Sequence, residues 1–91
     1  MRFYKLGIHI AKSLAALLTP QQLQRFLQTP TSQLTEYQQS LGMWIRNHIL
    51  PHNTYLCEAL SLLGMASSDE KSLYLIEFAQ HYLILERADM Q

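Results

Sequence analysis

The sequence predicts an all-α protein, a compact bundle of about five short helices in a single domain over residues 1–91. Apolar residues recur at spacings of three and four along most of the chain, which is the period of an amphipathic helix. No segment alternates as a half-buried strand would. Residues that cap or end helices separate the periodic segments, and neither a repeat nor a linker divides them. One small helical domain is therefore expected.

The first two helices are predicted at the N-terminal end of the chain. The first should cover about residues 3–18, where one apolar stripe consists of Phe3, Leu6, Ile10, Leu14 and Leu17. Thr19 is a favourable N-cap and Pro20 is accepted at the first helical position, so a second helix should run from Pro20 to Gln28. Its inward face consists of Leu23, Phe26 and Leu27.

A loop over residues 29–32 precedes the third helix, because Pro30 disfavours a helical conformation at Thr29. The third helix is predicted over about residues 32–48. Its inward face consists of Leu34, Tyr37, Leu41, Trp44 and Ile45. Gly42 interrupts this helix at a cost of about 1 kcal/mol relative to Ala, which suggests a close helix crossing.

A break at Pro51 separates the third helix from a fourth, which is capped by Asn53 or Thr54 and ends at Leu63. Its inward face consists of Leu56, Leu60 and Leu63. Gly64 comes directly after this helix, at the position where a residue in the left-handed backbone conformation commonly ends a helix. It is therefore predicted to have a structural role.

Ser67 and Glu70 have the spacing of a capping box, which predicts the start of a fifth helix. This helix should run to about Arg87 and carries two apolar stripes. The first consists of Leu73, Ile76, Ala79 and Leu83, and the second of Leu75, Phe78, Tyr82 and Leu85. An apolar surface this wide is expected either to be deeply buried or to be shared with a partner.

Charge is sparse and unevenly distributed. Charged residues make up 15% of the chain, against about 25% in typical proteins, and the formal net charge is zero. A neutral surface with few charges favours association. Residues 1–30 contain four basic residues and no acid, whereas residues 31–91 contain seven acids against three basic residues. These halves are expected either to attract each other in the fold or to address partners of opposite charge.

The sequence contains no catalytic, cofactor or metal signature. Pro51 separates His48 from His52, and the single cysteine, Cys57, can form neither an intrachain disulfide nor a zinc site of the usual spacing. The glycines are too isolated for a phosphate-binding loop, and no serine lies in a nucleophile turn. We therefore expect a protein that is not an enzyme and uses no cofactor or metal, with Cys57 as a small buried hydrophobe.

The residues around the end of the third helix are predicted to be structural. Trp44 lies on the apolar stripe and is expected in the core. Arg46 and Asn47 could satisfy the last carbonyl groups of the helix. Arg46 could also hold Asp69 or Glu70 at the start of the fifth helix and so lock the helical hairpin.

Two charged surfaces are candidates for binding. The basic first helix contributes Arg2, Lys5 and Lys12, with Arg25 following in the second. The pI is near 6.9, and these four basic residues are fewer than the basic patch of a typical nucleic-acid-binding domain contains. Nucleic-acid binding is therefore not favoured. A rigid acidic face is favoured instead, because it could enter a basic cleft. Its candidate residues are Glu58, Asp69, Glu70, Glu77 and Glu86.

About half of the chain resembles small helical bacterial proteins of poorly defined function. The pattern reads LG-x-x-IRN, an apolar helix, Gly, and D-x-x-S before a last helix; it is met by Leu41-Gly42, Ile45-Arg46-Asn47, Gly64, Asp69 and Ser72. That pattern would favour Pro-Asp where Ser68-Asp69 stands. The small helical format also resembles immunity proteins of toxin–immunity pairs, including contact-dependent inhibition systems. The resemblance implies a binding role and supplies no catalytic residues.

We therefore expect a cytoplasmic protein-binding module, an immunity protein or antitoxin that neutralises a bacterial toxin, such as a nuclease, by occluding its active site. Its partner would be a basic toxin domain. One alternative is a homo-oligomeric structural or adaptor domain, such as a homodimer, that uses the wide apolar surface of the fifth helix. Another is a weak nucleic-acid-binding regulator that uses the first helix. A membrane protein is not expected, because no segment approaches about 18 uninterrupted apolar residues.

Overall fold

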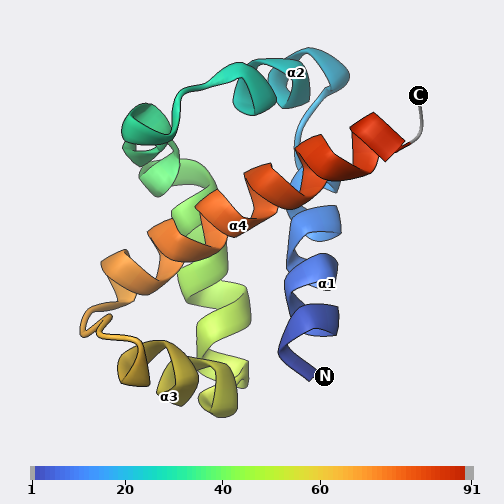
Figure 1. The fold of residues 1–91 in the computed structure, drawn as a ribbon. Helices are drawn as coiled ribbons and strands as arrows, with labels where there is room; N and C mark the ends of the chain where they lie inside the picture. Colours follow the sequence, from blue (N-terminus) through green and yellow to red (C-terminus); the bar gives the residue numbers. More distant parts are fainter. Residues whose placement is uncertain (1, 90–91) are drawn as a thin grey trace.

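The computed structural model describes residues 2–89 and the side chains of residues 5–88, so the predicted roles of the Arg2 and Phe3 side chains lie outside the described residues. The α-helices are α1 (Arg2–Ala16), α2 (Pro20–Gln28), α3 (Thr54–Leu62) and α4 (Ser68–Asp89) (Figure 1). Between α2 and α3 lie the short segments η1 (Thr31–Tyr37), η2 (Gln38–Gly42), η3 (Ile45–Ile49) and η4 (Leu50–His52). No strand occurs between residues 2 and 89, which confirms the predicted all-α class.

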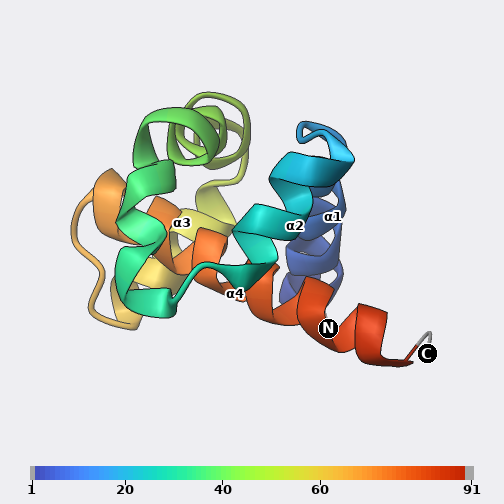
Figure 2. The same ribbon diagram turned by 90° about the horizontal axis from the view of Figure 1, so that it is seen from above.

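The longest helix, α4, is central to the fold. It packs against α1 and against the segments η1 to η3. The helix α2 spans the distance between α1 and η1 (Figures 1 and 2). The core lies where these elements meet α4. Its most deeply buried apolar residues are Ile10, Ala11, Leu14, Phe26, Leu34, Ile45, Ile76 and Ala79. The radius of gyration of 12.7 Å is close to the value of about 12 Å expected for a compact chain of this length.

The wide apolar surface of α4 is largely used inside the chain. Leu75, Ile76, Ala79 and Leu83 are buried, while Leu73, Phe78 and Tyr82 are partly buried. Only Leu85 of the two predicted stripes is exposed among the described residues. Burial within the fold therefore accounts for most of this surface, and little of it is left for a second copy.

The prediction of one α-helix over residues 32–48 is wrong, because 3₁₀ and π hydrogen-bond patterns dominate this region. Within residues 2–89, four α-helices and four short 3₁₀ or π segments take the place of the predicted bundle of about five helices. Near the end of the region, Pro51 has no N–H to donate to the preceding turn, and the chain tightens into the 3₁₀ segment η4. The exposed carbonyl oxygens are satisfied locally: Asn53 Nδ2 donates to the Ile49 carbonyl at 2.7 Å, and Cys57 Sγ lies 3.3 Å from the Leu50 carbonyl.

Local capping residues determine three helix ends as predicted. Thr19 and Gln22 form a reciprocal capping box at the start of α2, with backbone-to-side-chain distances of 2.9 and 3.1 Å. Gly64 ends α3 with a φ of 99°, in a Schellman motif in which the Met65 N–H donates to the Leu60 carbonyl at 3.1 Å. Ser67 caps α4 by accepting the Glu70 N–H at 3.1 Å.

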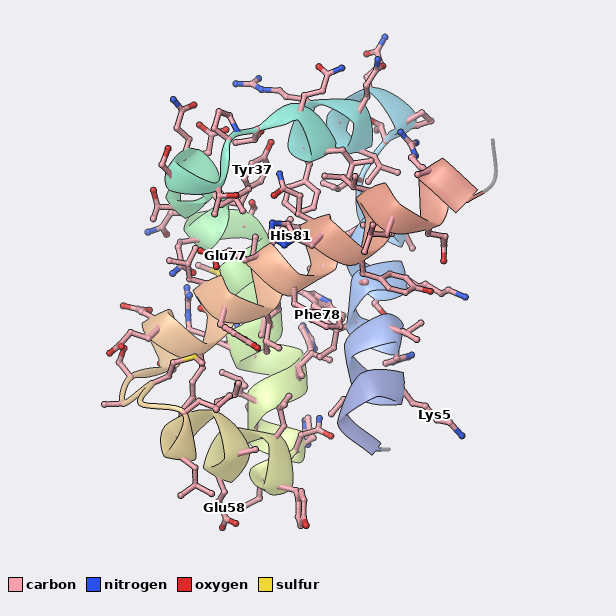
Figure 3. The ribbon with its side chains drawn as sticks, viewed as in Figure 1. Lys5, Tyr37, Glu58, Glu77, Phe78 and His81 are labelled. Carbon is pink, nitrogen blue, oxygen red and sulfur yellow. The ribbon has the colours of Figure 1, made fainter. Side chains whose placement is uncertain are left out.

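The crossing of α1 and α4 depends on a glycine that sequence reasoning had left without a role. A Cβ atom on Gly7 would lie 2.6 Å from Phe78 Cε1, so the ring occupies the space that any other side chain would need. Figure 3 shows Phe78 directed from α4 toward α1. Gly7 therefore permits a close contact between these two helices.

Candidate functional site

Four polar side chains meet where η2 and η3 pack against the start of α4; they are Gln38, Arg46, Asp69 and Ser72, and we call them the Arg46 cluster. Arg46 Nη1 donates to Gln38 Oε1 and to Ser72 Oγ, at 3.1 Å each. Arg46 Nη2 donates to the Gln38 carbonyl at 3.1 Å. Arg46 Nη1 also lies 3.5 Å from Asp69 Oδ1, which is the ion pair suggested by the sequence.

Burial indicates which of these contacts stabilise the fold. Ser72 is fully buried, whereas the Asp69 side chain is 78% exposed. An exposed ion pair contributes at most about 1 kcal/mol, while leaving a buried polar group without its partner costs about 1–3 kcal/mol. The hydrogen bonds of the Arg46 guanidinium are therefore more important than its ion pair, and they occupy it within the fold.

Gly42 is buried directly against the Arg46 cluster. A Cβ atom there would collide with Gln38 Oε1 and would lie 3.0 Å from Arg46 Nη1. The sequence suggested that Gly42 permits a close crossing of two helices. The atoms that approach Gly42 belong instead to Gln38 and Arg46, which lie in the same region of the chain. Gln38 in turn donates from Nε2 to the Asp69 carbonyl at 2.9 Å, which ties η2 to α4.

A second buried polar contact ties α2 to α4. Gln80 is only 2% exposed, and its Nε2 donates to the carbonyl oxygens of Phe26 at 2.9 Å and Thr29 at 2.7 Å. These carbonyl groups belong to the last turn of α2 and the residue after it; the Phe26 carbonyl also accepts the Thr29 N–H at 3.2 Å. Gln80 therefore fixes the end of α2 on the central helix.

The other residues predicted to be structural differ in their surroundings. Trp44 is partly buried and packs at the edge of the core, with its ring centroid 5.5 Å from that of His48. Asn47 is exposed, and no hydrogen bond of its side chain is present among the described residues. Trp44 is thus accessible to a partner on one side.

The five acidic candidates do not form one face. Glu58 lies on the outer side of α3, far from Glu77 on α4 (Figure 3). Glu77 and Glu86 are nine residues apart on the same helix and so point to opposite sides of it. Internal contacts occupy the remaining acids: Asp69 pairs with Arg46, Glu70 accepts from the Ser67 hydroxyl at 3.2 Å, and Glu86 accepts from the Tyr82 hydroxyl at 2.8 Å.

An open groove with a volume of about 630 Å³ lies between the α1–α2 corner and the η1–η2 region, and we call it the Trp44 groove. One wall consists of Leu17, Leu18, Gln22 and Arg25. The facing wall consists of Glu36, Tyr37, Ser40, Leu41 and Trp44. The volume lies in the range of sites that enclose a ligand or a partner side chain, about 300–1,000 Å³.

The aromatic side chains of the Trp44 groove are held in place by neighbours. The Tyr37 ring meets the buried Phe26 ring edge-on, with centroids 5.0 Å apart and an interplanar angle of 79°. The Tyr37 hydroxyl lies 3.4 Å from Thr29 Oγ1. The Tyr37 side of the groove is therefore largely preformed, while Trp44 contacts His48, which is itself exposed.

Each wall of the Trp44 groove carries one charge. Arg25 and Glu36 are exposed, and neither side chain forms an ion pair or hydrogen bond with any described residue. The groove therefore combines an apolar and aromatic surface with one cationic and one anionic group that no described residue neutralises.

A smaller cavity of about 320 Å³ lies between α1, α3 and α4, and its lining is apolar apart from Tyr74. It offers few polar groups to orient a ligand. Across the described part of the chain, no three His, Cys, Asp or Glu side chains gather as metal ligands would. Among residues 2–89, no helix has both the length and the apolar character needed to cross a bilayer.

These features define a small helical protein with a partly preformed surface groove. Comparison with protein-family models, with curated proteins and with solved structures finds no match for this chain. Its function is therefore inferred from its own residues.

Sequence reasoning missed the Trp44 groove, as well as the buried roles of Ser72 and Gln80. A signal for the last two is present in the sequence. Ser72 and Gln80 stand four residues before and four residues after the core residue Ile76, so both occupy the buried face of the helix. A polar residue in such a position is expected to have a specific hydrogen-bond partner.

Proposed function

We propose that this protein is a protein-binding module that captures a segment of a partner in the Trp44 groove. The observation that carries this proposal is the composition of the groove, where Trp44 and Tyr37 on one wall face Arg25 on the other, and no described residue pairs with the Arg25 side chain. Trp, Tyr and Arg are the residues most enriched among those that dominate binding energy at interfaces. The half-exposed Leu17 adds apolar area to the same surface.

The order of the groove also favours binding. A partner that enters a preformed site does not have to order its walls, which lowers the entropic cost of association. The buried Phe26 already packs edge-on against Tyr37, and His48 contacts the Trp44 ring. The free energy released by burying apolar side chains is then available for affinity.

The specific role that we propose is neutralisation of a toxin, in the manner of an immunity protein. A groove of this size would hold a loop or helix of the toxin while the body of the domain covers the active site. Because the acidic residues are dispersed, they would act by long-range steering of a basic partner and not as one contact surface. Glu58, which is exposed, would contribute to this steering.

A blocking substitution tests the proposal without removing core atoms. Ser40 is exposed in the groove, and Ser40→Arg would fill it. Ser61→Arg is a matched control, because Ser61 is also exposed and its hydroxyl, like that of Ser40, donates to a backbone carbonyl three or four residues earlier in the chain. The wild type and both variants would be immobilised and exposed to lysate from the source organism, and the retained proteins would be quantified by mass spectrometry.

The proposal predicts that one protein is retained by the wild type and by Ser61→Arg but lost with Ser40→Arg. A toxin as that protein would support the neutralising role, and inhibition of its activity by the wild type would test that role directly. Equal retention by all three proteins would overturn the groove as the binding site. A further variant, Glu58→Lys with Glu77→Lys, should slow association without abolishing it if the acids act by steering.

A further inference from the structure

The two charges of the Trp44 groove narrow down the kind of segment that it accepts. Arg25 projects from the α2 wall and Glu36 from the η1 wall, and neither is neutralised by a described residue. Leu41, Tyr37 and Trp44 lie along the wall that carries Glu36, and Leu17 and Leu18 along the other. A cation on one wall and an anion on the other thus border an apolar surface to which both walls contribute.

We infer that the occupant is a partner segment in which a large aliphatic or aromatic side chain is flanked by a carboxylate on the Arg25 side and by a Lys or Arg on the Glu36 side. This inference rests on the proposed binding function and specifies its ligand. Insertion of the apolar side chain would exclude water from the groove and so strengthen both flanking ion pairs. The carboxylate would accept two hydrogen bonds from the Arg25 guanidinium, a geometry for which arginine is well suited.

The same arrangement discriminates against other partners. A nucleic acid or another polyanion would be repelled by Glu36, and a uniformly basic segment would be repelled by Arg25. Like charges brought together at an interface cost free energy. A partner with the wrong charge at either position therefore binds more weakly than a partner whose charges match. The charge order, and not the total charge, is therefore what the groove recognises.

A displayed library of random peptides tests this inference on the full chain. The library would be selected against the wild type and against the double reversal Arg25→Glu/Glu36→Arg, with Ser40→Arg used to subtract peptides that bind elsewhere. A second variant, Arg87→Glu, is the control, because it reverses one exposed charge outside the groove. Circular dichroism would establish that each variant is folded, and Arg25→Gln would replace the reversal at this position if the α2 helix does not tolerate an acid.

The expected result is that peptides enriched on the wild type carry acid, apolar and basic residues in one order, and that the double reversal enriches the opposite order. Synthetic peptides of the first order should bind the double reversal at least about tenfold more weakly than they bind the wild type, a difference of about 1.4 kcal/mol. The control variant should enrich the same peptides as the wild type.

Enriched peptides whose charges do not respond to the reversal would overturn the inference while leaving groove binding intact. Absence of any peptide that Ser40→Arg eliminates would also overturn it, and the lysate experiment would then decide separately whether the groove binds a folded surface. A dimer that Ser40→Arg dissociates, measured by analytical ultracentrifugation, would replace the partner segment with a second copy of this chain.

Discussion

The Arg46 guanidinium donates a hydrogen bond of 3.1 Å to the hydroxyl group of Ser72, which lies 26 residues further along the chain and is completely buried. This contact joins η3 to the central helix α4. The same guanidinium also bonds to the side chain and backbone of Gln38, so one residue links three parts of the chain.

Arg46→Ala is therefore expected to lower the free energy of unfolding by about 3 kcal/mol, because Ser72 and the Gln38 carbonyl lose a buried donor. Asp69→Asn should cost no more than about 1 kcal/mol, since its ion pair is exposed. Urea denaturation of both variants measures the difference, with Arg87→Ala as a control on an exposed arginine. A larger loss for Asp69→Asn than for Arg46→Ala would show that the ion pair, and not the hydrogen-bond network, stabilises this junction.

Gln80 should be intolerant of both apolar and charged replacements. Gln80→Leu keeps most of the volume but leaves the carbonyl oxygen of Thr29 without its donor, which should cost about 1–3 kcal/mol. Gln80→Glu should cost more at neutral pH, because a buried carboxylate would face the two carbonyl oxygens. Thermal unfolding followed by circular dichroism should rank the proteins as wild type, Leu variant and Glu variant in falling stability, and a Glu variant as stable as the wild type would contradict the contact.

At the crossing of α1 and α4, Gly7→Ala should destabilise the wild type by about 1–3 kcal/mol, because the new methyl group would meet the Phe78 ring. In a Phe78→Leu background the same substitution should be neutral or stabilising by up to about 1 kcal/mol, since Ala is the better helix former. A double-mutant cycle measured by urea denaturation tests the coupling. Identical effects of Gly7→Ala in the two backgrounds would exclude the steric contact.

Substitutions at Gly64 test how much the backbone conformation at the end of α3 contributes to stability, without a change in side-chain contacts. Its φ of 99° disfavours residues with a Cβ atom, although nothing lies within 4 Å of the position a Cβ would occupy. Gly64→Ala should therefore cost about 1 kcal/mol, and Gly64→Asn should cost less because Asn adopts left-handed conformations more readily. Both values can be measured by denaturant unfolding; equal stability of the Ala variant and the wild type would argue against the Schellman motif.

Three helix ends could be predicted from the sequence because they depend on residues three to five positions apart. Thr19 and Gln22, or Leu60 and Met65, interact whatever the rest of the chain does. The pattern of apolar residues likewise predicted the all-α class and most core positions. These features are encoded locally, so a single sequence is sufficient to identify them.

The 3₁₀ and π segments η1 to η4 and the Trp44 groove could not be predicted in this way. The π turns of η2 and η3 accompany contacts between Gln38, Arg46 and Ser72, and the last of these belongs to a distant helix. The groove exists because the corner after α1 brings Leu17 opposite Trp44. Periodicity gives the face of a helix on which a residue lies, but it does not give the neighbour that the face will meet.

The two buried polar contacts of α4 also have a mechanical consequence. Gln80 holds α2, which supplies Arg25 to one wall of the groove, and Ser72 takes part in the contacts that hold Gln38, next to Tyr37 in the other wall. The central helix thus acts as a spacer that sets the width of the Trp44 groove, to which it contributes no side chain among the described residues. Substitutions in the middle of α4 are therefore expected to widen or narrow the groove without changing its lining residues, and under the proposed function they would change the affinity without touching the bound partner.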